Sequence, residues 1–220
     1  MTYRSLIRFA PFVLALALTG GAIAPAAAQA SERGYIGLSL QKYALGSGFD
    51  GVSYFASDTE AFVVPEIGTA TGIGLRLGFR SQRAAGEVAY VRASHAASWM
   101  GATGTATSKS LDLNVKVFFS PASRTQPFLL AGLAFPSLTV ADGSYSLGGG
   151  TSNATYYGLG MNLGAGVEHQ FDRRVALQAA LVYAPNFFHT VKSDYVDVDQ
   201  EIESLNGSHF ALEASVLMGF

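Results

Sequence analysis

Seven charged residues share one face of segments that are otherwise apolar, and they are the first candidates for a chemical role. The set holds three basic and four acidic residues: Arg76, Arg80, Glu87, Asp112, Lys116, Glu168 and Glu213. A charge that is buried in protein must be paired, because removing an isolated ion from water is costly. The pattern therefore predicts an internal network of ion pairs that fills a polar interior. The alternative is a narrow or gated pore that the same groups line.

Nucleophilic catalysis would need a serine and a histidine on the same face, within hydrogen-bond reach of each other. The histidines are scattered: His95, His169, His189 and His209. No His-x-Ser pair lies on one strand face, and the neighbours Ser208 and His209 would point to opposite faces of a strand. The sequence therefore predicts isolated histidines and a protein that is not an enzyme.

An acidic stretch near the C-terminus is the only candidate for a metal site. It contains Asp194, Asp197, Asp199, Glu201 and Glu203. Alternate carboxylates on an extended segment could bind Ca²⁺ or Mg²⁺, but the spacing of an EF-hand loop is missing. The chain has no cysteine, which excludes a disulfide framework and a thiolate metal site. We expect a solvated acidic surface, with no metal and no cofactor.

Strict alternation of apolar and polar residues predicts the strands that position these groups. Eight strands are expected, at about 34–44, 71–80, 85–93, 109–119, 127–135, 157–168, 175–184 and 208–220. Long loops are expected at 45–69, 94–107, 136–154 and 185–207, and short turns join the other strands. The fifth strand is apolar on both faces; we favour the arrangement in which Leu129 and Phe135 point outward.

These features predict an all-β protein, an eight-stranded antiparallel transmembrane β-barrel. Alternating long and short connections are typical of outer-membrane barrels, with short periplasmic turns and long extracellular loops. An arginine on the lipid side near mid-membrane would cost roughly 2–4 kcal/mol, so the charged face must point inward. The rival interpretation is a soluble periplasmic β-protein.

The first thirty residues predict a secretory signal peptide, residues 1–30, ahead of a single barrel domain, residues 31–220. Arg4 and Arg8 precede an apolar run, and Ala28-Gln29-Ala30 is a small-x-small cleavage site. The alternative is a membrane anchor. Cleavage leaves 12 basic residues against 16 acidic ones, a net charge of −4 that gives no support for nucleic-acid binding.

The chain resembles the OmpA/OmpX-like family of small outer-membrane β-barrels over essentially all of residues 34–220. The resemblance rests on the strand count, on Gly-rich segments such as TGIGLRLGF at 71–79, and on a final strand that ends in an aromatic residue. The alternating apolar residues of that strand resemble the signal that the barrel-assembly machinery reads: Phe210, Leu212, Val216, Met218 and Phe220. We expect no peptidoglycan-binding domain of the kind that full-length OmpA carries, so its anchoring role is not implied.

The resemblance implies a protein of the bacterial outer membrane in contact with lipid and lipopolysaccharide. The first expectation is a structural or surface-interaction role, in which the loops meet an extracellular partner. The alternatives are a small porin-like channel and, since some outer-membrane barrels are lipid-A hydrolases, a lipid-A-modifying enzyme.

Overall fold

The computed structural model describes residues 33–220 except 44, 47, 53, 57–59, 120–122, 147–148 and 195–199. The predicted signal peptide lies outside the described residues. The described part consists of strands, turns and irregular segments. It contains no helix that is long and apolar enough to span a membrane, a finding that does not bear on spanning by strands.

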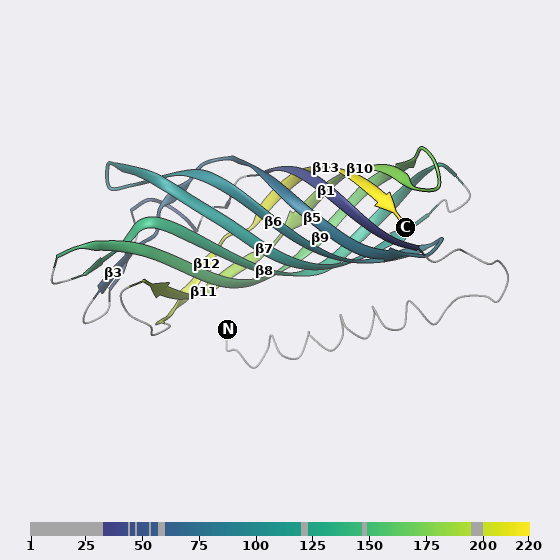
Figure 1. The fold of residues 1–220 in the computed structure, drawn as a ribbon. Coiled ribbons are helices and arrows are strands. Elements are labelled where there is room, and N and C mark those ends of the chain that lie inside the picture. Colours follow the sequence, from purple (N-terminus) through teal and green to yellow (C-terminus); the bar gives the residue numbers. More distant parts are fainter. Residues whose placement is uncertain are drawn as a thin grey trace.

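Eight long strands form a closed antiparallel ring, as the alternation predicts (Figure 1). In ring order they are β1 (Arg33–Tyr43), β5 (Ala70–Arg80), β6 (Ala84–Trp99), β7 (Ala102–Phe118), β8 (Thr125–Ser146), β9 (Thr151–Gln170), β10 (Val175–Ala184) and β13 (His209–Gly219). Closure occurs at β13, which pairs with β10 on one side and with β1 on the other. The fold is therefore the predicted eight-stranded barrel.

Burial alternates along the ring strands because one face meets the interior and the other faces outward. On β5, for example, Ile73, Leu75, Leu77 and Phe79 are exposed while the residues between them are buried. The fifth spanning strand, β8, has the facing that we favoured, with Leu129 and Phe135 exposed. An outward surface of large apolar side chains is what a lipid-embedded barrel requires.

Two of the predicted loops, 94–107 and 136–154, were wrong, because most of their residues continue the neighbouring strands. β6 and β7 stay in register from Ala84↔Val117 to Trp99↔Ala102, across the predicted loop 94–107. The turn is only Met100-Gly101, with φ of 47° and 82°, which suits a two-residue hairpin. Likewise β8 and β9 run through most of 136–154. Outside the lipid, neither face of a strand needs a continuous row of apolar residues. The alternation of apolar and polar residues that predicts strands is therefore weaker in these segments.

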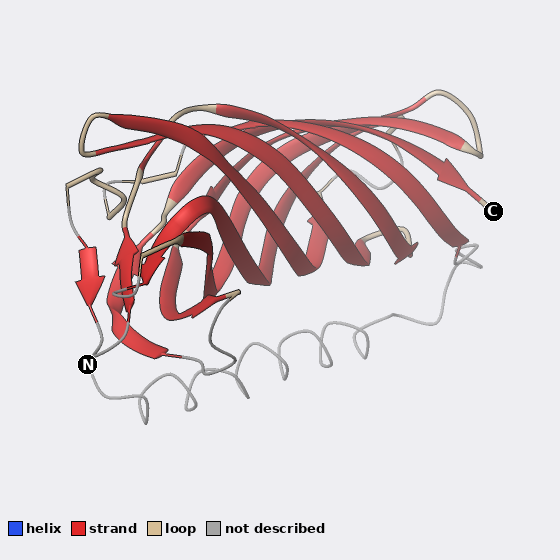
Figure 2. Ribbon diagram, turned by 60° about the vertical axis from the view of Figure 1, so that its left-hand side comes forward, coloured by secondary structure: helices blue, strands red, loops and turns tan. Residues whose placement is uncertain are grey.

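The other two predicted loops contain short strands at the same end of the barrel. β2 (Tyr54–Ala56), β3 (Glu60–Val63) and β4 (Glu66–Ile67) lie within 45–69. β11 (Asn186–Ser193) and β12 (Gln200–Asn206) lie within 185–207. β3 pairs with the end of β8, and β4 pairs with the end of β6. β3, β11 and β12 gather at one end of the barrel and the C-terminus lies at the other (Figures 1 and 2).

An apolar cluster fills the interior at the end of the long hairpins, and we call it the apolar cap. Its buried members are Phe49, Phe62, Val63, Val64, Ile67, Ala97, Trp99, Ala106, Leu138, Val140, Ala154, Tyr156, Phe188 and Val191. Phe49 and Val64 lie in connecting segments, and the other members come from β3, β4, β6, β7, β8, β9 and β11. The cap therefore joins four adjacent ring strands to the short strands at this end. The polar interior lies between this cap and the short turns.

Candidate functional site: the filled lumen

The centre of the lumen holds a cluster of ion pairs around two buried cations. Arg76 on β5 contacts Glu87 on β6 at 2.7 Å and also forms an ion pair with Glu213 on β13. Lys116 on β7 donates to the other oxygen of Glu87 at 2.7 Å. Tyr35 on β1 donates a hydrogen bond to the same carboxylate at 2.9 Å. One glutamate thus joins three neighbouring strands and the tyrosine of a fourth.

Uncharged polar groups extend this cluster to more strands. Gln41 on β1 donates to Glu213 at 2.9 Å, and Ser215 donates to the other oxygen of that carboxylate at 3.1 Å. Lys116 also donates to the amide oxygen of Gln178 on β10 at 3.0 Å. In the ring, β10 lies three strands from β7, so this hydrogen bond crosses the lumen.

A further ion pair spans the barrel nearer the short turns. Arg80 pairs with Glu168 and also donates to the side-chain oxygen of Gln126. The guanidinium lies 3.9 Å from the ring centre of Phe118, within the range of a cation–π contact. Arg80 lies on β5 and Glu168 on β9, which are opposite strands in an eight-membered ring. Their side chains therefore meet across the full width of the lumen.

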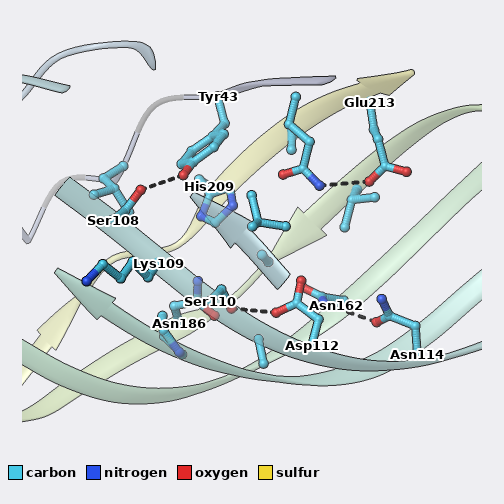
Figure 3. A pocket seen from close by; sticks show the side chains of 18 of the residues that line it. Tyr43, Ser108, Lys109, Ser110, Asp112, Asn114, Asn162, Asn186, His209 and Glu213 are labelled. Carbon is cyan, nitrogen blue, oxygen red and sulfur yellow. Dashed lines mark hydrogen bonds between the residues drawn. The ribbon is translucent and has the colours of Figure 1, made fainter. Parts of the chain in front are cut away.

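Asp112 is the one residue of the predicted charge network that the structure leaves out. Within the described residues it forms no ion pair; its carboxylate accepts a hydrogen bond from Ser110, two positions away. It lines a small cavity beside Asn114 and Asn162, which are hydrogen-bonded to each other at 3.1 Å (Figure 3). The prediction failed here because alternation fixes the facing of a side chain but not its partner across the lumen.

This cavity lies between the ion pairs and the apolar cap. Its volume is about 50 Å³, and its lining includes Gln41, Arg76 and Glu213 from the central cluster and Phe188 from the cap. Such a space has room for roughly three to five water molecules. The cavity is therefore a wet pocket inside a filled barrel.

His95 is not isolated, which corrects the sequence-based interpretation. Its Nε2 lies 2.9 Å from Ser108 Oγ, and its Nδ1 lies 3.0 Å from the carbonyl oxygen of Gly68, which can only accept. Nδ1 therefore carries the proton, and Ser108 donates to Nε2. The hydroxyl of Tyr43 lies 2.6 Å from Ser108 Oγ and donates to it. The signal missed in the sequence was the two-residue turn, which fixes the register of β6 against β7.

Two of the other three histidines, His169 and His209, have local contacts. His209 stacks on Tyr43 with ring centres 4.7 Å apart, and His169 contacts Thr125 at 2.8 Å. His189 is exposed on β11. Each therefore has an ordinary structural environment.

The predicted acidic surface is only partly described. Asp197 and Asp199 lie outside the described residues, and Asp194 accepts a hydrogen bond from Asn153 at 2.9 Å. Glu201 and Glu203 lie on β12. Among the described residues, no three acidic or histidine side chains are placed to hold a metal ion.

The family model for the outer membrane protein beta-barrel domain matches residues 13–213. The chain therefore belongs to this family of outer-membrane β-barrel proteins. No curated protein sequence matches it.

Solved structures with the same fold include Neisserial surface protein A, NspA, at 19% identity and a TM-score of 0.55, covering 85% of this chain and 97% of that one. OprG of Pseudomonas aeruginosa follows at 10% identity and a TM-score of 0.53, covering 88% and 99%. AlkL, solved by solid-state NMR in lipid bilayers, has 13% identity and a TM-score of 0.50, covering 90% and 94%. These similarities establish the fold and leave the individual role open.

Proposed function

We propose that this protein is a non-enzymatic outer-membrane barrel with a closed lumen, which supports the envelope and presents its long hairpins to the cell's surroundings. The observation that carries the proposal is the ion pair between Arg80 and Glu168, which joins opposite walls. An eight-stranded barrel has an interior just wide enough for side chains to fill, so one such bridge leaves little open cross-section.

Two further layers support a closed lumen. The Arg76 cluster lies above the bridge, and the apolar cap lies beyond the cavity. Passage of an ion would require it to leave water, separate buried ion pairs and cross an apolar layer, and each of these steps is costly. If the lumen is closed, partners would bind at the hairpins β6–β7, β8–β9 and β11–β12.

The route to the membrane is part of the proposal. The leader at residues 1–30 would direct export and be cleaved, and the barrel-assembly machinery would read the last strand. Along β13 and at the residue that follows it, Phe210, Leu212, Val216, Met218 and Phe220 are all exposed on the outward face. Such a row is available to a receptor before the strand inserts.

Single-channel conductance tests the closed lumen. Protein purified from outer membranes and checked for folding by a heat-dependent gel shift would be added to a planar bilayer. We expect no steady openings, whereas an Arg80→Ala/Phe188→Ala variant should show at least brief ones. Steady, charge-selective openings of the unaltered protein would refute the closed lumen.

A porin-like channel is the second candidate, and the cavity with Asp112 is the observation that favours it. Its carboxylate lines the cavity and forms no ion pair among the described residues, as a transient ion site would. This candidate predicts conductance that changes in selectivity when Asp112 is replaced by Asn.

The lipid-A hydrolase is a third candidate, and the hydrogen bond between Ser108 and His95 is what favours it. Against it, Tyr43 occupies the remaining side of the hydroxyl, and both partners are buried beside a cavity of only about 50 Å³. An acyl chain has no room there. Overproduction should leave the lipid A mass unchanged, and a shifted mass that depends on Ser108 would favour the hydrolase.

A further inference from the structure

Two cations face each other on the outer wall of the barrel. Arg92 on β6 and Lys109 on β7 are direct cross-strand partners, and both are exposed. Side chains at such positions are close neighbours, and like charges placed there destabilise a sheet. Lys42 on β1 is a third exposed cation, two strands away and offset by two residues from Arg92. Strand spacing and rise place it roughly 12 Å from Arg92.

No acidic side chain balances this basic patch within the described residues. The outward positions around the Arg92–Lys109 pair are occupied by Ile73, Tyr90, Ser94, Thr107, Leu111 and Ser137. The described ion pairs all lie inside the lumen and involve none of Lys42, Arg92 and Lys109. An anion from outside the chain would convert this repulsion into attraction.

The patch lies at the edge of the lipid-facing surface that is nearer the long hairpins, which we call the upper edge. Lys109 stands ten positions before Phe119, and the outward residues between them are all apolar. Ten residues at about 3.3 Å each, tilted by about 40°, rise by about 25 Å, the height of the apolar band of such barrels. Beyond Lys109, the outward positions of β7 are threonines. The cations are therefore at headgroup height in the outer leaflet.

On the other side of β1, at the same end of the barrel, the outward surface carries an aromatic pair in place of the cations. Tyr183 on β10 and Phe210 on β13 contact each other with ring centres 4.8 Å apart, and both are exposed. Aromatic girdles anchor a barrel in any lipid. A basic sector instead selects an anionic headgroup.

We propose that Lys42, Arg92 and Lys109 form a binding site for a phosphate group of lipid A. Arg92 offers a planar fork that fits phosphate oxygens, and the lysines add mobile positive charge. Tyr90 and Leu111, just below the pair, provide an apolar surface for the acyl chains. This inference rests on the proposed function only for the barrel's orientation in the outer membrane, and it does not depend on whether the lumen conducts.

Unfolding temperature in detergent, with and without added lipid A, tests the site. The protein would be purified from outer membranes and stripped of lipid, and folding would be checked by the heat-dependent gel shift. We expect lipid A to raise the unfolding temperature of the unaltered protein. In an Arg92→Gln/Lys109→Gln variant, the lipid-free unfolding temperature should stay equal or rise, because repulsion is relieved, while lipid A binds at least tenfold more weakly.

The matched control is Arg83→Gln/Arg124→Gln, which makes the same charge change on exposed turns at the opposite end. It should keep the full response to lipid A. Dephosphorylated lipid A and phosphatidylglycerol serve as separate probes. Neither should raise the unfolding temperature as much as phosphorylated lipid A. Equal binding of either probe, or an unchanged response in the Arg92/Lys109 variant, would overturn the proposal. Conductance of the same samples reports on the lumen independently.

Discussion

Replacing Arg76 by Leu should strongly destabilise the barrel. Arg76 is 2% exposed and pairs with both Glu87 and Glu213. Glu87 would keep Lys116 and the tyrosine hydroxyl, but Glu213 would keep only two neutral donors. Breaking a buried ion pair by removing one partner costs about 3–5 kcal/mol, because the other charge stays buried. We expect a loss in this range.

Reversible urea unfolding in lipid vesicles measures the loss, and two variants make the measurement specific. Arg76→Leu/Glu213→Leu removes both charges of one pair, so it should recover at least about 2 kcal/mol relative to Arg76→Leu. Arg83→Leu, on an exposed turn, should lie within about 0.5 kcal/mol of the unaltered protein. If Arg76→Leu costs less than about 1 kcal/mol, as for a solvent-screened pair, the lumen holds water and our reasoning is wrong.

Three further predictions concern the wall, a turn and assembly. Gly132→Ala would place a methyl group against the carbonyl oxygen of Leu113. It should lower the free energy of unfolding by about 1–3 kcal/mol in the same assay. Gly86 has open space around it, so Gly86→Ala should not destabilise the barrel. The backbone N–H groups of Arg174 and Val175 donate to Oδ1 of Asp172 at 2.6 and 2.8 Å. These hydrogen bonds hold the pKa of the Asp172 carboxyl below its usual value. The ionised carboxylate should therefore stabilise the turn fully at pH values above the usual aspartate pKa, and this stabilisation should be lost as the pH falls through the lowered pKa of Asp172. NMR titration of Asp172 and amide exchange at the turn would measure both. Phe220→Ser should reduce assembly into the outer membrane, and normal assembly would count against the proposed signal.

The part of the barrel inside lipid could be predicted because lipid imposes a rule on every second residue. β10 begins and ends at the predicted residues, Val175 and Ala184, and the outward rows of the other spanning strands match the alternation. The facing of Arg76 and Arg80 follows from the same rule, since a charge cannot stay on the lipid side without a large cost.

What the sequence did not reveal depends on register and on contacts across the lumen. The hairpin extensions carry serine, threonine and alanine on their outward faces, so no apolar period marks them. The contact between His95 and Ser108 depends on a turn at Met100-Gly101 that composition alone did not identify. Asp112 faces inward as predicted, but its level in the barrel places it beside asparagines instead of a cation.

Access of water-soluble reagents to the cavity tests the closed lumen most directly. The chain has no cysteine, so Asn162→Cys places a single thiol on the cavity wall, with Met100→Cys and Arg124→Cys as exposed controls at the two ends. In folded protein in vesicles, a charged methanethiosulfonate reagent should label both controls within minutes and leave the cavity thiol unmodified until urea unfolds the barrel. Labelling of the cavity thiol in the folded barrel at a rate close to that of the controls would contradict a closed lumen.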